Sequence, residues 1–351
     1  MIKSFSGFRF IFALLICLAH MILAPEFGGK GLFFDTNAPL AFFFVLSGFV
    51  LTFSYYEKIQ ENQFNAAFFL KKRFAKLYPT HLLALAIVLL LFAKTYTWNG
   101  ETWTQLFAQI FLVHSYVPKI EWYFAFNRVS WYLSTLFFLY ICFAFIFPKI
   151  LKARKNMLIL FGLCIIWAFG MVLTAHFYKS NDDYIFSVCP LPRLLDFFLG
   201  AWLYLLYKKL QNINFSPIIC TILEIIALMA LPVTYALNSF IHIPTKSQLC
   251  FLYLPAVSVL ILVFALTDGK GIFAKIFGSK PMQNLGNISF AFYMVHLYNQ
   301  SLFDLIEPFD WYLTNPVFFV SGYLLFTIAM SFVIEYFFTR KIAALILKKG
   351  K

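Results

Sequence analysis

Charged residues are scarce in this chain of 351 residues, because Asp, Glu, Lys and Arg together make up only 12% of it. Hydrophobic residues make up 62%, aromatic residues 21%, and the mean hydropathy is +0.80. The surface of a soluble globular protein needs more polar side chains than this composition supplies. The scarcity of charge therefore excludes a soluble protein and predicts an integral membrane protein, whose apolar side chains face lipid.

Paired cysteines, internal repeats and low-complexity segments are also missing. No spacing among the six cysteines suits a metal site; they are Cys17, Cys142, Cys164, Cys189, Cys220 and Cys250. The first apolar run has no small-residue cleavage pattern, so we expect no cleavable signal peptide. Because no polar stretch is long enough for an appended soluble domain, we predict a single transmembrane domain over residues 1–351.

Long apolar runs are abundant, and each is near the length needed to cross about 30 Å of hydrocarbon. The sequence therefore predicts an all-α polytopic bundle of about ten transmembrane helices. The ten runs are 8–25, 35–55, 78–95, 130–148, 156–176, 194–207, 216–236, 250–267, 285–303 and 315–337.

The basic residues are distributed unevenly among the loops between these runs. If the N-terminus is cytoplasmic, 21 of the 28 Lys and Arg residues fall on the inner side, which the positive-inside rule requires. Both termini are then cytoplasmic. The net charge of +13 is explained by topology, so we expect no nucleic-acid partner. This count requires the apolar segment 105–117 to be interfacial or re-entrant, because a further span would invert everything after it.

Two ionisable residues, Arg9 and His20, bracket an apolar stretch in the first run. Eleven residues of helix correspond to about 16 Å and about three turns, so both side chains lie on nearly the same face. Ionisable groups at membrane depth are costly and indicate function by default. A cytoplasmic cation suits phosphate binding and a deep imidazole suits proton transfer, although a snorkelling arginine and a hydrogen-bonded structural histidine explain the pair equally well.

Two further features stand in the second and third runs. Ser47 and Gly48 lie in "FFFVLSGFVL", where small residues by themselves indicate close helix packing. Arg73 and Lys76 are three residues apart in "LKKRFAKLYPTHLL", a spacing that puts both charges on one helical face. Such a pair fits a phosphate clamp or an ordinary positive-inside flank.

These motifs resemble, in order, those of the membrane acyltransferase family of type three. Arg9 and His20 match the family's arginine and histidine separated by ten residues, and "FFFVLSGF" matches its Phe-rich Leu-Ser-Gly-Phe motif. "RFAKLYP" resembles the family's Arg-x-x-Arg-Ile-x-Pro segment, with Lys76 at the second arginine. Lysine keeps the charge at this position but not the planar fork of arginine.

Later segments extend the resemblance over nearly the whole chain. They are "SWYLSTLFFLY", "PRLLDFFLG", "LGNISFAFYMVH" and "SFVIEYFF", which place Trp131, Ser134, Tyr140, Arg193, Phe197, Gly200, Gly286, Ser289, Tyr293, His296 and Glu335 on family positions. Three positions depart from the family pattern. Leu136 replaces a glutamate found in many members, Phe290 a tyrosine and Phe337 a proline, so any role of that glutamate is absent here or moved.

The resemblance implies an enzyme that carries an acyl group from coenzyme A to an extracytoplasmic hydroxyl. Arg9, Arg73 and Lys76 are then expected to bind the donor phosphates, with the pantetheine arm reaching toward His20. His20 acts as general base or accepts the acyl group itself. Acetyl-CoA or another acyl-CoA is the expected donor substrate, and no permanently bound cofactor is expected.

The acceptor expected from the resemblance is a glycan or glycolipid, such as lipopolysaccharide O-antigen or exopolysaccharide, at a bacterial inner membrane. Asp35 either orients the His20 imidazole or is only a helix-end residue. Glu335 is expected to pair with Arg9 or Arg340. The remaining candidates either line the acceptor cleft or support the structure; they are Ser47, Trp131, Ser134, Arg193, Tyr293 and His296.

A transporter or flippase that moves a glycan or lipid without covalent chemistry is the alternative class. Many spans with intramembrane ionisable residues would suit it. The lack of repeat symmetry and the combination of cytoplasmic cations with a deep histidine argue against it.

Overall fold

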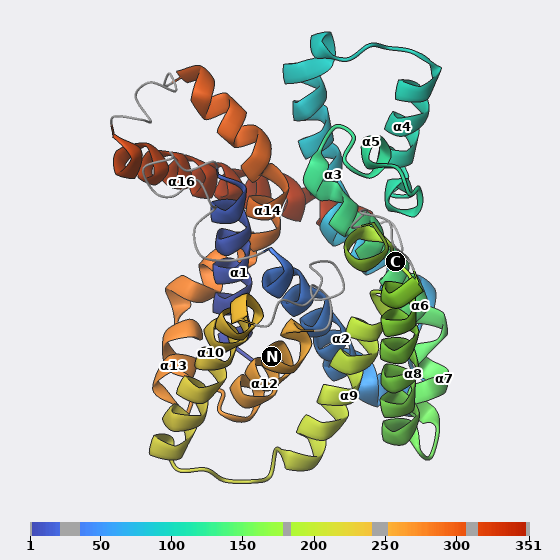
Figure 1. Ribbon diagram of the computed structural model, residues 1–351, viewed down its shortest axis with the longest axis vertical. Helices are drawn as coiled ribbons and strands as arrows, with labels where there is room; N and C mark the ends of the chain where they lie inside the picture. Colours follow the sequence, from blue (N-terminus) through green and yellow to red (C-terminus); the bar gives the residue numbers. More distant parts are fainter. Residues whose placement is uncertain (1, 22–35, 178–183, 241–251, 307–314, 349–351) are drawn as a thin grey trace. The chain divides into compact units, whose positions relative to one another are not determined.

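The computed structural model describes residues 2–21, 36–177, 184–240, 252–306 and 315–348, and all secondary structure in these ranges is helical (Figure 1). Each of the ten apolar runs overlaps a helix in its described residues, which confirms the all-α prediction. These helices are α1 (Ser4–His20), α2 (Asn37–Gln60), α3 (Ala66–Phe92), α6 (Trp131–Phe145), α8 (Asn156–Phe177), α9 (Leu194–Leu210), α10 (Pro217–Phe240), α12 (Tyr253–Leu266), α14 (Lys280–Ile306) and α16 (Pro316–Val333).

Length and composition identify candidate membrane-spanning helices. Six segments among the described residues are long and apolar enough to cross a bilayer: Asn37–Gln60, Ala66–Thr95, Arg128–Phe145, Asn156–Thr174, Pro217–Leu237 and Val317–Lys348. The count of about ten spans and the cytoplasmic side of both termini stay predictions.

The apolar segment 105–117 does not form a spanning helix. It contains the end of α4 (Gly100–Ile110) and the short 3₁₀ turn η3 (His114–Tyr116). A helix of 11 residues is about 16 Å long, roughly half the hydrocarbon thickness. Leu112, between the two elements, has a φ of 57°, which ends the helix. This short helix agrees with a non-spanning segment, and its interfacial or re-entrant position stays a prediction.

The helix that carries the third apolar run begins earlier than the run itself. The sequence placed the run at 78–95, but α3 begins at Ala66 and carries Pro79 in its interior. Arg73 and Lys76 therefore lie on a helix that continues into the apolar run. A proline is tolerated inside a helix of a membrane protein when neighbouring groups satisfy the freed backbone carbonyl.

The chain forms two compact units, each discontinuous in sequence. Unit one consists of Met1–Arg9, Thr36–Phe69 and Thr135–Gly286, and unit two of Phe10–Asp35, Leu70–Ser134 and Asn287–Lys351. The single transmembrane domain over 1–351 stays a prediction.

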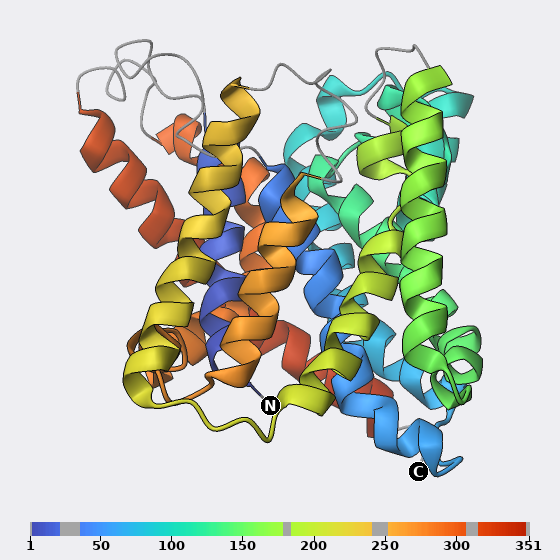
Figure 2. The same ribbon diagram turned by 60° about the horizontal axis from the view of Figure 1, so that its bottom comes forward.

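In unit one, α2 and α9 pack closely along their length, as both ribbon views show (Figures 1 and 2). A Cβ on Gly48 would lie 2.6 Å from the Phe197 carbonyl oxygen, and a Cβ on Gly200 would overlap the Val45 carbonyl oxygen. Glycine at both positions lets the two backbones approach. This contact confirms the close-packing interpretation of Gly48.

Two other helices of unit one, α8 and α10, face outward. Only 17% of the most apolar 18-residue segment of each is buried, against 67% for α2. Leu158, Ile166 and Ile218 are among the large side chains left exposed. An outward face of this composition is what contact with lipid tails requires.

Unit two contains the part of α14 that follows Gly286 and the part of α1 that follows Arg9. Phe10 and Phe292 bring these helices into contact, with ring centroids 5.5 Å apart. After α16 the chain passes through a π-helical turn, η6 (Ile334–Thr339), into the short amphipathic helix α17 (Arg340–Lys348).

We expect cysteine-accessibility labelling to place 58–76, 149–155 and 340–351 on the cytoplasmic side. Segments 177–190 and 304–312 should be labelled from outside by a membrane-impermeant maleimide. The reason is the excess of Lys and Arg in the first three segments. External labelling of 149–155 would contradict the ten-span topology.

Candidate active site

Arg9 and His20 are carried by one uninterrupted helix, as the sequence predicts. α1 runs from Ser4 to His20, and both side chains are half-buried. Their separation of eleven positions corresponds to about 16 Å along the axis. Arg9 belongs to unit one and His20, the last residue of α1, to unit two.

His20 forms a hydrogen-bonded pair with His296 of α14. The His20 Nδ1 atom is 2.8 Å from His296 Nε2, and the two rings are parallel with centroids 5.1 Å apart. The side chain of His296 is buried, and its Nδ1 is 2.7 Å from the Tyr293 carbonyl oxygen.

The direction of these hydrogen bonds follows from the chemistry of the partners. A carbonyl oxygen only accepts, so His296 Nδ1 must carry the hydrogen that it donates to Tyr293. In a neutral imidazole the other nitrogen is then an acceptor, and His296 Nε2 accepts from His20 Nδ1–H. The lone pair of His20 is then on Nε2, the atom that can act as a base or nucleophile.

The backbone of α14 around His296 is held by three other side chains. Tyr323 of α16 donates from its hydroxyl to the His296 carbonyl oxygen at 2.7 Å. Asn127 Nδ2 donates to the Met294 carbonyl at 3.1 Å, and the Tyr293 hydroxyl donates to the Val129 carbonyl at 3.1 Å. These bonds attach both α16 and the loop before α6 to the turn that presents His296.

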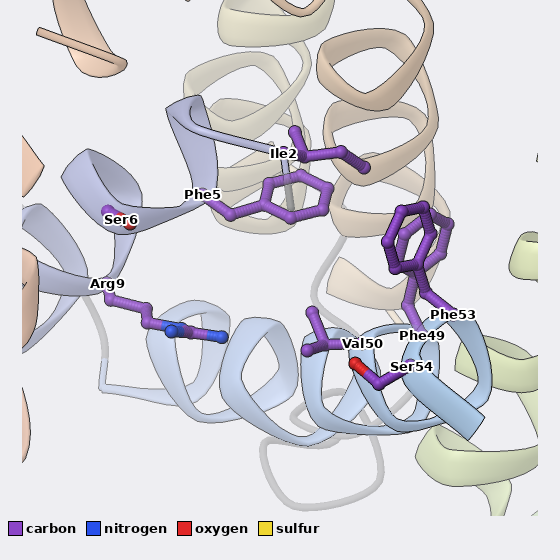
Figure 3. Close-up of a pocket in the computed structure, with 8 residues that line it drawn as sticks. All are labelled: Ile2, Phe5, Ser6, Arg9, Phe49, Val50, Phe53 and Ser54. Carbon is purple, nitrogen blue, oxygen red and sulfur yellow. The ribbon is translucent and has the colours of Figure 1, made fainter.

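On the predicted donor side, Arg9 lines a pocket of about 220 Å³ within unit one (Figure 3). The guanidinium group extends from α1 toward the part of α2 that carries Val50 (Figure 3). The lining combines three polar side chains with five apolar ones: Ser6, Arg9 and Ser54 with Ile2, Phe5, Phe49, Val50 and Phe53. A cation set in an apolar wall suits a ligand with both phosphate and aliphatic parts.

Arg73 and Lys76 share one helical face of α3, the former half-buried and the latter exposed. They belong to unit two, whereas Arg9 belongs to unit one. Their expected joint action on a donor phosphate therefore stays a prediction.

Ser134 and Ser47 are engaged in structural hydrogen bonds. Ser134 is fully buried; its Oγ donates to the Leu112 carbonyl at 2.6 Å and lies 2.6 Å from Ser115 Oγ. Ser47 Oγ donates to the Phe43 carbonyl of its own helix at 2.7 Å. These contacts favour structural support for both serines over contact with an acceptor.

Arg193 and Trp131, two other sequence candidates, are also buried. Arg193 forms an ion pair of 3.2 Å with Asp196, donates from Nε to the Ser187 carbonyl at 3.1 Å, and lies over the Phe44 ring. This engagement makes Arg193 a structural anchor of unit one. Trp131, at the start of α6, packs beside Tyr132.

Glu335 pairs with Arg340, one of the two partners expected for it, across the π-helical turn η6. The Arg340 Nε atom lies 3.1 Å from Glu335 Oε1, and the guanidinium group stacks over the Tyr336 ring at 4.0 Å. Asp35 lies outside the described residues.

Sequence reasoning missed a buried polar network in unit two. Gln109 is its centre: its backbone carbonyl accepts from His81 Nε2 at 3.0 Å, its Nε2 donates to the Ala125 carbonyl at 2.6 Å, and Ser130 Oγ donates to its Oε1 at 2.7 Å. His114 Nε2 is 3.2 Å from Ser130 Oγ. Burial lowers the pKa of His114 to about 3, so this imidazole is neutral at physiological pH.

This network ties the non-spanning segment 105–117 to α3 and to the loop before α6. Polar residues inside apolar runs, such as His81, Gln109 and His114, were the available signal. Periodicity does not reveal which of them contact one another.

Comparison with known proteins shows the family of the chain. The chain matches the family described as an acyltransferase domain over residues 2–336, and it therefore belongs to this family. Family membership and the membrane-spanning helices together define a membrane acyltransferase, and they favour an enzyme over the transporter alternative.

Curated relatives cover different parts of the chain. An acyltransferase named MdmB from Streptomyces mycarofaciens is 26% identical over 316 residues, which are 84% of this chain and 78% of that protein. Protein 2 in the picA locus of Rhizobium radiobacter is 41% identical over 92 residues, 26% of this chain and 45% of that protein. An uncharacterised protein of Haemophilus influenzae is 24% identical over 206 residues, 54% of this chain and 83% of that protein. No solved structure matches the chain significantly.

Proposed function

We propose that this membrane acyltransferase transfers an acetyl group from cytoplasmic acetyl-CoA to a hydroxyl of an extracytoplasmic glycan. The observation that carries the proposal is the His20–His296 pair, whose hydrogen bonds leave a lone pair on His20 Nε2. Both the general-base route and the covalent route need a neutral imidazole with a free nitrogen. O-antigen or exopolysaccharide at a bacterial inner membrane is the proposed setting.

In the general-base route, His20 Nε2 takes the proton of the acceptor hydroxyl while the hydroxyl oxygen attacks the thioester carbonyl. The new C–O bond forms, the C–S bond breaks, and the leaving thiolate takes the proton back from the imidazolium. In the covalent route, Nε2 attacks the thioester carbonyl first, the C–S bond breaks and coenzyme A leaves as its thiolate. The acyl group then passes from Nε2 to the acceptor oxygen, and the thiolate takes the proton that the acceptor hydroxyl loses. Both routes return His20 to its neutral form.

The donor is proposed to bind through its phosphates at Arg9, Arg73 and Lys76. The pocket at Arg9 supports this, because it combines a guanidinium group with hydroxyl and apolar side chains. The arm of coenzyme A would then follow α1 toward His20, over the 16 Å or so that separate the two residues along the helix.

The function is tested by incubating the purified protein with radiolabelled acetyl-CoA and the glycan extract of cells that lack this protein. The expected result is transfer of label to the glycan. Glycans of the deleted cells should also be lighter than wild-type glycans by the mass of an acetyl group. A protein that moves the glycan across vesicles without acetylating it would contradict the proposal.

We expect Arg73→Ala and Lys76→Ala each to weaken acetyl-CoA binding by about 10- to 100-fold. Each change removes a charge-assisted phosphate contact of roughly 1.5–3 kcal/mol. Lys76→Arg should bind at least as well as the wild type. Titration calorimetry on the purified protein measures the effect.

Lys71→Ala is the matched control for these two variants, because residues two apart on a helix do not share a face. It removes the same charge from α3 and should leave donor binding unchanged. Wild-type affinity in both test variants would show that Arg73 and Lys76 only mark the cytoplasmic end of a span and do not bind the donor.

A further inference from the structure

A second pocket, of about 260 Å³, lies wholly within unit two. It is formed where the chain leaves α3, by α4, by α5 (Ile120–Tyr123) and by the loop that follows α5; Figure 1 shows these elements side by side. Its lining residues are Tyr96, Gln105, Glu121, Phe124, Ala125, Phe126 and Arg128.

The lining combines aromatic rings with hydrogen-bonding side chains. The Tyr96 and Phe126 rings are 4.9 Å apart between centroids, and the Arg128 guanidinium lies 5.2 Å from the Phe124 centroid. Gln105, Glu121 and Arg128 supply amide, carboxylate and guanidinium groups. Aromatic faces pack against the C–H faces of a pyranose ring, and such polar groups hydrogen-bond in pairs to its hydroxyls.

The charge of this lining selects among ligands. One carboxylate and one guanidinium balance each other, so the pocket has no net charge. A phosphate or a polyanionic chain would need an excess of cations. A neutral, hydroxyl-rich ligand fits both the balanced charge and the aromatic surface.

Hydrogen bonds connect the pocket to the histidine pair. Phe126 and Arg128 of the lining alternate in sequence with Asn127 and Val129, which are hydrogen-bonded to Met294 and Tyr293 of α14. His296 follows two residues after Met294 and holds His20.

We propose that this pocket binds a neutral sugar of the acceptor, and that it delivers a hydroxyl of that sugar or of its neighbour to His20. The inference rests on the proposed acyl transfer and identifies the acceptor side of the same site. The topology predicted from the basic residues puts Arg128 on the outer side of the membrane, where an extracytoplasmic glycan is available.

Binding is tested without catalysis by saturation-transfer NMR of the purified protein with the methyl glycosides of glucose, galactose, mannose and rhamnose. We expect at least one glycoside to bind and to receive saturation mainly on the C–H protons of one ring face. Gln105→Ala and Glu121→Gln should each raise its Kd by about tenfold, as the loss of a hydrogen bond to such a group predicts.

Glu101→Gln is the matched control. Glu101 is an exposed acid of α4 that does not line the pocket and accepts a hydrogen bond from Trp122, which glutamine can also accept. This variant should bind glycoside like the wild type. The proposal would be overturned if none of the four glycosides binds, or if the wild type and both pocket variants have equal Kd values. The aromatic residues of the pocket would then only anchor the protein at the membrane interface.

A kinetic measurement separates this inference from the function on which it rests. With labelled acetyl-CoA and the glycan extract, Gln105→Ala and Glu121→Gln should raise the KM for glycan and leave the KM for acetyl-CoA unchanged. Transfer with a wild-type glycan KM in both variants contradicts the pocket assignment alone. Glycoside binding that follows the expected pattern in a protein that transfers no acetyl group contradicts the enzymatic proposal alone.

Discussion

Replacement of His20 by glutamine is expected to abolish acetyl transfer while the protein still inserts, purifies and binds acetyl-CoA. A glutamine amide can donate to His296 Nε2 as His20 Nδ1 does, so the structural contact is retained. An amide cannot take a proton from a hydroxyl or carry an acyl group, and general-base catalysis alone contributes about 10²–10⁴-fold. Single-turnover transfer of labelled acetyl groups to the glycan extract measures the loss.

A matched control for this variant is His81→Gln. His81 is another buried histidine in an apolar helix, and it donates from Nε2 to the Gln109 carbonyl, which an amide can also do. We expect this variant to retain transfer. A near wild-type rate in His20→Gln would instead show that the histidine at the end of α1 only packs helices.

The helical architecture could be predicted from the sequence because each apolar run had to satisfy its backbone within one helix. The runs 156–176 and 216–236 became α8 and α10, with ends within a few residues of the prediction. The start of α3 could not be found this way. Its first turns carry Lys71, Lys72 and Arg73, and hydropathy alone does not distinguish a charged helix from a loop.

Individual site residues were predictable to different degrees. Arg9 and His20 were found because ionisable groups at membrane depth are rare. The ion pair of Arg193 with Asp196 was available from the spacing of three residues but was not recognised. The contact between His20 and His296 joins residues 276 positions apart, and no local pattern encodes such a pairing.

The packing role of the family glycines can be recognised only in the folded chain. A Cβ on Gly286 would overlap the backbone of Ser6, just as Gly48 and Gly200 permit the contact of α2 with α9. These motif positions therefore maintain helix packing in unit one. Chemistry is proposed only for certain ionisable motif residues, which are Arg9, His20, Arg73, Lys76 and His296.

His296→Phe is expected to lower kcat for acetyl transfer by about 10²–10⁴-fold without weakening acetyl-CoA binding. Phenylalanine preserves a planar ring in the same buried space but cannot accept the hydrogen of His20 Nδ1. The His20 ring then loses the partner that fixes both its orientation and its tautomer, and an imidazole in the wrong tautomer presents N–H instead of a lone pair. The readouts are kcat and the donor Kd, measured separately on the purified variant.

The conservative variant His296→Gln distinguishes this positioning role from a purely structural one. Its carbonyl oxygen can accept from His20 Nδ1–H, so it should recover a large part of kcat relative to His296→Phe. If packing were the only role, the phenylalanine variant, which keeps a ring in place, would be the less damaged of the two. That order of rates, or equal kcat values in the wild type and His296→Phe, would contradict the assignment. The lone pair on His20 Nε2 depends on a chain of hydrogen bonds that begins at the Tyr293 carbonyl and passes through His296. The two substitutions at His296 break and restore this chain, and so test whether it controls the rate.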